Sequence, residues 1–268
     1  MGNNGSISAP FDGVADAYDT DFTQTRIGRY QRAMVWDALD RHFPGTLPLH
    51  ILELNCGTGT DAMFLASRGH HVIATDRSKP MLDVARTKSE KAAIHGIRFR
   101  QLDMCNTDDV LPPSDAVFSD FGGWNCLSPA DLVSLSARLY EALPAGGLVV
   151  AVIMPPVCLW EMFYFAVRLR WLSMGRRWKK GPVRARVGDG HVDTWYYTPA
   201  RIGKLLSRHF SIIETQPVGF FVPPSFMEPY FNENPDALSS LARRDRNLIH
   251  RSFLSYLSDH YLIALRRN

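Results

Sequence analysis

The sequence lacks several features that would assign it to a class at once. No uninterrupted apolar run approaches the roughly 18 to 20 residues of a membrane span, and no signal peptide opens the chain. There are few cysteines, and they show neither a C-x-x-C spacing nor a metal-binding pattern: Cys56, Cys105, Cys126 and Cys158. We therefore expect reduced thiols, no metal site, no transmembrane span and a cytoplasmic location.

An excess of one charge is also missing, because 30 basic residues face 27 acidic ones and the net charge is only +3. This balance does not by itself indicate a nucleic-acid partner. The 268 residues can bury a full hydrophobic core, and one large domain with insertions is the expectation. Met1 to Ser6 matches the N-myristoylation pattern, but we interpret residues 1–10 as a polar leader.

The most informative stretch is an apolar run from Leu49 to Leu54 that is followed by Gly57 and Gly59. The run predicts a buried strand, and a helical pattern begins at Ala62. A strand that passes through a glycine turn into a helix brings backbone N–H groups and a positive helix end close to a ligand. Glycine is needed where a side chain would block the ligand or forbid the turn. The stretch predicts a site for a nucleotide-type ligand.

Strand and helix patterns alternate along much of the chain. We expect strands at 49–54, 71–75, 97–102, 115–119, 147–154, 210–214 and 260–265, and helices at 60–68, 79–94, 129–142 and 199–208. This alternation implies a parallel sheet covered by helices on both faces. We expect a single domain with four parts: N-terminal cap helices (11–45), a core (46–155), a lid or insertion (156–197), and a C-terminal core with a second insertion (198–268).

Two nucleotide classes fit the glycine turn. Gly57-x-Gly59-x-x-Ala62 matches the dinucleotide fingerprint G-x-G-x-x-G/A, and Asp76 ends the next strand, where a ribose-binding acid belongs. Glu53, however, lies in the strand four residues before the first glycine. Its charge would repel a pyrophosphate and attract a cation. An NAD(P)-dependent dehydrogenase on a Rossmann fold is therefore the alternative interpretation.

The string Glu53-Leu-Asn-Cys-Gly-Thr-Gly59 resembles the first motif, E/D-x-x-x-G-x-G, of class I S-adenosylmethionine (SAM)-dependent methyltransferases. SAM carries a sulfonium and an ammonium and has no phosphate. The segment from Phe11 to Asp19 is similar to the N-terminal helix that many small-molecule members fold over the cofactor. The resemblance implies a three-layer α/β sandwich with helical insertions. Its seven-stranded, mostly parallel Rossmann-like sheet would have the order 3-2-1-4-5-7-6 and an antiparallel last strand.

The resemblance also implies which residues hold SAM and, after transfer, S-adenosylhomocysteine (SAH). Asp76 would accept hydrogen bonds from both ribose hydroxyls, with Arg77 and Met81 flanking the ribose and adenine. Asp103 would accept from the adenine amino group, and the backbone of Met104 would reach a ring nitrogen. Further contacts, near the methionine part or the sulfonium, are expected from Tyr18, Glu53, Asn55, Gly57, Gly59 and Ser119. Tyr18 fits an aromatic packed under its helix equally well.

The sequence says less about the methyl acceptor. Transfer from a sulfonium is an in-line displacement, so a base is needed only if the acceptor must lose a proton. The catalytic residues stay unknown, and the candidate bases are His191, Asp120, Tyr196 and Tyr197. The candidate acceptor-binding residues are Trp124, Asn125 and Trp160. An exposed histidine and packed tryptophans are the structural alternatives.

Residues 157–186 combine an aromatic helix with eight basic residues, and no acid occurs between Glu161 and Asp189. This combination suits a lid over an apolar substrate, an interfacial helix on anionic lipid or an RNA-binding segment. The fourth alternative is an extra helix packed on the domain with a solvated basic flank. After the fourth strand, Asp120-Phe-Gly-Gly replaces the N/D-P-P-Y/F of base-flipping methyltransferases.

We therefore predict a cytoplasmic SAM-dependent methyltransferase that acts on a small, partly apolar metabolite, as a monomer or homodimer and without a nucleic-acid partner. Peripheral membrane contact is left open. The non-enzymatic alternative is a membrane- or RNA-binding module that keeps the cofactor fold as a scaffold.

Overall fold

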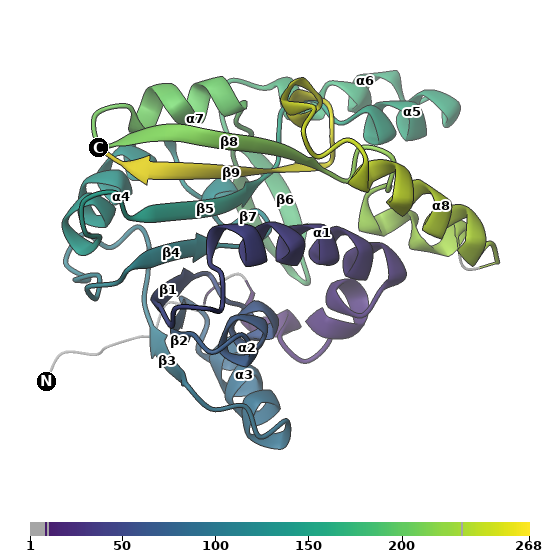
Figure 1. The fold of residues 1–268 in the computed structure, drawn as a ribbon. Helices are drawn as coiled ribbons and strands as arrows, with labels where there is room; N and C mark the ends of the chain where they lie inside the picture. Colours follow the sequence, from purple (N-terminus) through teal and green to yellow (C-terminus); the bar gives the residue numbers. More distant parts are fainter. Residues whose placement is uncertain (1–8, 10, 232) are drawn as a thin grey trace, which may run out of the picture.

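A seven-stranded sheet forms the centre of the computed structural model (Figure 1), which describes residues 9, 11–231 and 233–268. The strand order is β3-β2-β1-β4-β5-β9-β8. The strands are β1 (His50–Leu54), β2 (His71–Asp76), β3 (Ile97–Gln101), β4 (Ala116–Ser119), β5 (Leu148–Ile153), β8 (Phe210–Val218) and β9 (His260–Arg267). The myristoylation pattern at Met1 to Ser6 lies outside the described residues.

The pairing directions confirm the predicted fold class. Strands β3, β2, β1, β4 and β5 pair in parallel, and β9 is antiparallel to both β5 and β8. Two further strands, β6 (Val183–Val187) and β7 (Gly190–Thr194), pair only with each other. Without this hairpin in the numbering, the sheet has the order 3-2-1-4-5-7-6 that the resemblance implies. The hairpin differs from the sequence-based expectation, because its two strands are only five residues long and alternate with charged side chains.

Helices cover both faces of the sheet. The main ones are α1 (Arg26–His42), α2 (Thr60–Ser67), α3 (Lys79–Lys91), α4 (Pro129–Ala142) and α7 (Pro199–Leu206). On one face Ile51 packs with apolar residues of α1, α2 and α3, and on the other Leu52 and Leu54 pack with α4 and α7. Successive residues of β1 thus supply opposite cores, as the pleat of a strand requires. Helices, sheet and helices therefore form three layers.

The remaining segments gather at one edge of the sheet. They are η1 (Asp12–Val14), η2 (Asp19–Thr23), η3 (Trp124–Cys126), α5 (Leu159–Val167), α6 (Trp171–Met174), η4 (Arg176–Trp178), η5 (Ser225–Tyr230), α8 (Pro235–Arg246) and η6 (Ser252–Tyr256). Figure 1 shows α5, α6 and α8 beyond the right-hand end of the sheet, where β4 points. The expected helix from residue 11 is instead the two short segments η1 and η2. No helix in the described part of the chain has the length and apolar character for a bilayer crossing.

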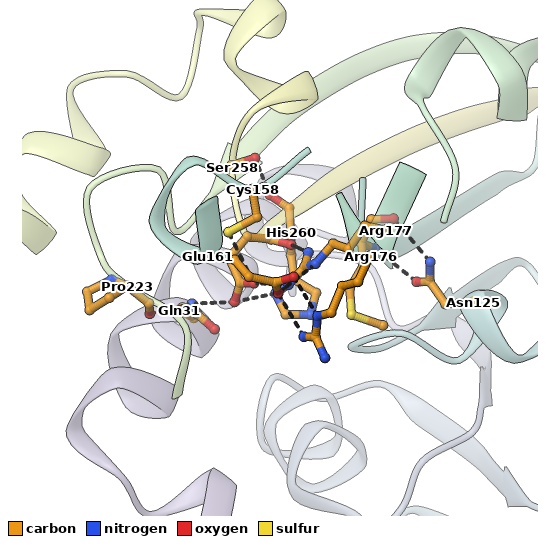
Figure 2. A network of polar contacts seen from close by, with 11 residues as sticks. Gln31, Asn125, Cys158, Glu161, Arg176, Arg177, Pro223, Ser258 and His260 are labelled. Carbon is orange, nitrogen blue, oxygen red and sulfur yellow. Dashed lines mark hydrogen bonds and ion pairs between the residues drawn. The ribbon is translucent and has the colours of Figure 1, made fainter. Parts of the chain in front are cut away.

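A buried ion-pair network fastens the first insertion to the sheet (Figure 2). Glu161 of α5 is 1% exposed and accepts hydrogen bonds from Arg176 at 2.6 and 2.8 Å and from Arg177 at 2.9 Å. Arg177 also donates to Asp259, just before β9, at 3.1 Å. Gln31 of α1 donates to the same carboxylate at 3.2 Å. The alternative of a solvated basic flank therefore does not hold for Arg177.

Glu161→Ala should lower the free energy of unfolding by about 3 kcal/mol, because it leaves the buried Arg177 guanidinium with only part of its countercharge. Urea unfolding followed by circular dichroism measures this loss. The matched control is Glu141→Ala, which removes an exposed acid of α4 and should change stability by less than about 0.5 kcal/mol. Equal effects of the two substitutions would contradict a stabilising network.

Candidate active site

A cavity of about 190 Å³ lies at the carboxyl ends of the parallel strands. Its walls come from Asn55 and Gly57 after β1, residues 76–78 at the end of β2, residues 102–105 after β3 and residues 121–123 after β4. Open α/β sheets bind their ligands at this edge. Residues that are far apart in the sequence thus converge on one cavity.

The turn between β1 and α2 has an unusual backbone. Asn55, Gly57 and Gly59 have φ angles of +49°, +51° and +75°. Asparagine tolerates this left-handed conformation better than most residues with a side chain. At Gly59 a Cβ would also lie 2.8 Å from the Cβ of Ala85, so this glycine allows α3 to approach the turn. Gly59 does not line the cavity, contrary to its predicted role as a cofactor contact.

Asp76 is held rigidly at the cavity wall. Its carboxylate accepts hydrogen bonds from the N–H of Gly57 at 2.9 Å and of Ser78 at 2.8 Å. Burial raises its pKa, although these bonds oppose the shift. A carboxylate has about four acceptor positions, so the backbone N–H groups leave acceptor capacity for a ligand. The arrangement suits a ligand with neighbouring hydroxyl donors.

A second acid, Asp103, lies on the same cavity after β3. It accepts from the N–H of Cys105 at 2.9 Å and pairs with Nε of Arg77 at 3.2 Å. Met81 of α3 and Met104 also line the cavity. The structure therefore brings these predicted residues together around one space.

The N-terminal segment closes another side. Tyr18 lines the cavity, and burial raises the pKa of its hydroxyl. The next residue, Asp19, accepts hydrogen bonds from Thr58 at 2.6 Å and from Lys88 at 2.5 Å. Lys88 also donates to Thr60 at 3.0 Å. These contacts fasten the segment to the glycine turn and to α3, so Tyr18 is a wall residue and not simply packing under a helix.

A smaller polar pocket of about 30 Å³ adjoins the cavity and shares Tyr18, Asn55, Gly57 and Phe121 with it. There the guanidinium of Arg32, from α1, forms ion pairs with Asp61 of α2 and, at 2.9 Å, with Asp120 after β4. Trp36 donates to Asp61 at 2.7 Å.

Glu53 adds a third acid close to this pair of carboxylates. It is fully buried, and neither carboxylate oxygen has a hydrogen-bond partner among the described residues. Burial raises its pKa well above the ordinary value, and the charges of Asp61 and Asp120 raise it further, while Arg32 opposes them. Burial and Asp61 also raise the pKa of Asp120. Three acids with one guanidinium favour a further positive charge.

Comparison with known proteins finds a methyltransferase domain within the chain. A family model described as a methyltransferase domain matches residues 51–147. The demethylmenaquinone methyltransferase of Clavibacter sepedonicus is 34% identical over 58% of this chain and 61% of its own length. The tRNA 5-carboxymethoxyuridine methyltransferase of Escherichia coli K12 is 33% identical over 52% of this chain and 53% of its own. Residues 51–147 thus form a methyltransferase domain, and the chain is similar to SAM-dependent methyltransferases.

Solved structures of methyltransferases share the fold. An S-adenosylmethionine-dependent methyltransferase from Mesorhizobium loti has a TM-score of 0.58 at 21% identity, covering 87% of this chain and 97% of its own. The DhpI–SAH complex has a TM-score of 0.59 at 18% identity, covering 96% and 93%. The relatives matched by sequence are spanned to only 61% and 53% of their lengths. The chain therefore shares its fold with these structures over most of its length, whereas the sequence matches cover only part of the relatives.

Several predicted site residues lie outside the cavity and support its walls. Glu53 acts on the polar pocket through its charge without lining it. Ser119 is buried and donates to the side-chain carbonyl of Asn55 at 2.6 Å, and the Asn55 amide donates to the backbone carbonyl of Asp120 at 2.9 Å. Ser119 thus positions Asn55.

The three candidate acceptor-binding residues prove to be structural. Trp124 is fully buried in the core beneath α4. Asn125 is also buried, and its amide nitrogen donates to the carbonyls of Met154 and Trp195. Trp160 donates to the carbonyl of Phe221 at 2.9 Å and so joins the two insertions. The prediction for these residues is corrected, because long-range packing uses all three.

The candidate bases do not reach the larger cavity either. His191 is exposed on β7, whereas its neighbour Val192 lines the cavity, because successive side chains of a strand point to opposite sides. The ring of Tyr196 lies under the guanidinium of Arg177, 5.2 Å from its centroid. Tyr197 is buried and donates to the carbonyl of Leu127 at 2.6 Å. Asp120 lines only the polar pocket.

Sequence analysis missed the other half of the polar pocket. Arg32 is 29 residues from Asp61 and 88 residues from Asp120, so no local pattern joins them. It also missed part of the cavity wall: Ala9, Phe11, Ser78, Leu102, Cys105, Phe121, Gly122, Gly123, Cys126, Leu127 and Val192. The only signal available was the position of several of these residues directly after strands.

Asp19→Asn should loosen the N-terminal segment and lower the free energy of unfolding by about 1–2 kcal/mol at neutral pH, since it removes hydrogen bonds between charged, partly exposed groups. Burial raises the pKa of Asp19, but the bonds from Lys88 and Thr58 leave it below the ordinary value. The stabilisation is therefore present at neutral pH and lost as the pH falls through the lowered pKa. Urea unfolding of both proteins across acidic pH measures it, and an unchanged difference at low pH would contradict it.

Proposed function

We propose that the protein transfers the methyl group of SAM to a small, partly apolar acceptor, and that SAM binds in the cavity. The observation that carries the proposal is the pair of acids on one cavity, Asp76 at the end of β2 and Asp103 after β3. In this proposal Asp76 would accept hydrogen bonds from the ribose hydroxyls, and Asp103 would accept one from the adenine amino group. When bound, SAM supplies an activated methyl group on a sulfonium.

The polar pocket fits the methionine part. Arg32 offers a guanidinium for a carboxylate, and the surplus acids Glu53, Asp61 and Asp120 favour an ammonium and a sulfonium. The uncompensated burial of Glu53 is easier to understand if the pocket holds a cation.

The same charges argue against the dehydrogenase alternative. A pyrophosphate at the glycine turn would lie close to the buried acids and be repelled by them. The N–H of Gly57, which a phosphate would need, already donates to Asp76. We therefore propose a sulfonium nucleoside and not a dinucleotide as the ligand.

The acceptor is proposed from the cavity and not from the relatives. One relative is named for a menaquinone precursor and another for a tRNA nucleoside, so the names point in two directions. The cavity wall contributes Phe121, Leu127 and Val192 beside the polar residues, which favours a partly apolar molecule. The free thiols of all four cysteines fit the proposed cytoplasmic location.

Catalysis in this proposal depends on alignment. Tyr18, Asn55 and Phe121 surround the junction of the cavity and the polar pocket and would orient the reacting groups. Binding there also excludes water from the junction. No candidate base from the sequence, apart from Asp120 in the polar pocket, lies on either space.

The direct test is calorimetric titration of the purified protein with SAH and, separately, with NAD(H), followed by a labelled-methyl assay on an extract of cellular metabolites. We expect saturable SAH binding, no NAD(H) binding and a labelled product in the organic-extractable fraction. Binding of NAD(H) without SAH would overturn the proposal.

Asp76→Ala should weaken SAH binding by about 1.5–3 kcal/mol, because it removes hydrogen bonds from the ribose to a charged acceptor. Calorimetry measures the change. Asp83→Ala, which removes an exposed acid of α3 that pairs with Lys79, is the matched control and should leave the affinity unchanged. Unaltered affinity in the Asp76 variant would remove the ribose assignment.

His191→Ala should change kcat/KM for the identified acceptor by less than about twofold, since the imidazole is exposed on the far side of β7. Steady-state kinetics with labelled SAM provides the measurement. A loss of about a hundredfold or more, the size expected for a missing general base, would restore the histidine to the mechanism.

A further inference from the structure

An exposed apolar surface covers α5, α6 and the segments beside them, and we call it the α5–α6 face. Its exposed apolar residues are Leu159, Phe163, Val167, Leu169, Trp171, Leu172 and Trp178. The surface continues onto η5, because the ring of Tyr164 lies 5.1 Å from Phe226 and 6.4 Å from Tyr230 between centroids, and both η5 side chains are exposed. Contiguous apolar surface of this kind usually marks an interaction site.

The tip of the face is the turn between α5 and α6. All six residues from Val167 to Leu172 are exposed, and Leu172 is 100% exposed. Leu169 has a φ of +56°, a left-handed conformation that costs a residue with a Cβ roughly 1–2 kcal/mol. The fold therefore holds an apolar side chain outward in a conformation that asparagine or glycine would adopt more easily.

The charge of the face is of one sign. Arg168, Arg170, Lys179 and Lys180 are exposed on it. The one acid of α5, Glu161, is buried and neutralised by Arg176 and Arg177. Glu228 of η5 accepts from the backbone N–H groups of Arg26 and Ile27. The acids of α5 and η5 are thus engaged by donors of the protein itself.

We propose that the α5–α6 face docks on the surface of an anionic lipid membrane. Exposed tryptophan and leucine side chains enter the interface between headgroups and acyl chains, and flanking arginines and lysines attract anionic headgroups. The face lies at the same edge of the sheet as the cavity, beyond the ends of β4 and β5 (Figure 1). Docking would therefore bring the cavity near lipid-soluble acceptors, a consequence that rests on the proposed function, whereas the docking itself does not.

Other partners fit the face less well. RNA bases could stack on Trp171 or on the arginines of the tip, but they have no use for its aliphatic side chains, Val167, Leu169 and Leu172, which a lipid interface would bury. A second copy of the chain on a twofold axis would bring the basic residues of one face against those of the other. A lipid surface alone complements both the apolar tip and the basic flank.

The test is cosedimentation of the full chain with vesicles of equal parts phosphatidylglycerol and phosphatidylcholine and with phosphatidylcholine alone. We expect binding to the anionic vesicles that weakens in high salt, and much weaker binding to the neutral ones. Lys179→Gln with Lys180→Gln should weaken binding to anionic vesicles about tenfold or more, from roughly a fivefold loss for each lysine near the surface.

Leu169→Asn with Leu172→Gln should weaken binding to the anionic vesicles at least about tenfold, because it removes the apolar tip. Asparagine accepts the left-handed conformation of residue 169, so thermal unfolding and SAH affinity should stay unchanged. The matched control, Leu47→Asn with Val110→Gln, alters apolar residues that are 66% and 77% exposed outside the face and should bind as the parent does.

Three outcomes would overturn the proposal: no binding to anionic vesicles, equal loss in the control, or salt-sensitive binding to bulk tRNA without vesicle binding, which would assign the face to RNA. SAH titration on the same preparations keeps this result separate from the proposed function. If the protein binds vesicles but not SAH, the docking proposal stands and the proposed methyltransferase function is overturned.

Discussion

The guanidinium of Arg32 is the interaction on which the site depends. It reaches from α1 to Asp61 on α2 and to Asp120 after β4, so one side chain joins the cap, the helix behind the glycine turn and the end of a central strand. All three groups are buried, and burial of charge is costly unless the charges are paired. Because Glu53 adds a further acid without a hydrogen bond of its own, the cluster is stable only with additional positive charge or bound protons. This imbalance shapes the polar end of the cavity.

The cavity keeps its shape because two turns interlock. Asn55, in the left-handed conformation after β1, accepts from Ser119 and donates to the carbonyl of Asp120. Its side chain lies so close to the turn after β4 that a Cβ at Gly123 would be 2.1 Å from Oδ1 of Asn55. Only glycine fits there. The Asn55 side-chain amide and the close approach that Gly123 allows thus fix the ends of β1 and β4 relative to each other.

The parts of the fold that sequence alone predicted are those with local causes. Ser78 accepts from the N–H of Met81, Ser128 forms a capping box with Asp131, and Thr198 caps α7, so these helices begin where the sequence indicates. Asp76 and Asp103 line one cavity, as expected, because the carboxyl ends of parallel strands meet at one edge of the sheet.

The predictions that differ from the structure concern residues whose position depends on contacts distant in the sequence. Trp124, Asn125 and Trp160 look like pocket residues in sequence, and distant partners such as Trp195 and Phe221 decide that they are structural. For His191 the deciding fact is register: in a strand, one of two neighbours faces the cavity, and Val192 does. The link from Arg32 to its two acids spans too much sequence for any pattern to show it.

The basic run of the first insertion shows the same limit most clearly. In the sequence its eight basic residues look equivalent. In the structure they differ, because a single buried acid, Glu161, pairs with two of them. Glu161 faces inward from α5, so Arg177 is buried beside it and Arg176 pairs with it at the margin. The other six stay exposed: Arg168, Arg170, Lys179, Lys180, Arg184 and Arg186.

The topology then determines where these outer residues point. Because β5 and β8 run in the same direction, the segments that follow them, residues 154–198 and 219–259, both leave the sheet at the edge that holds the cavity. Additions to this fold at these two places therefore come to lie beside the site. The surface that the insertions expose and the ligand that the core binds are in this way placed at one edge by the strand directions alone.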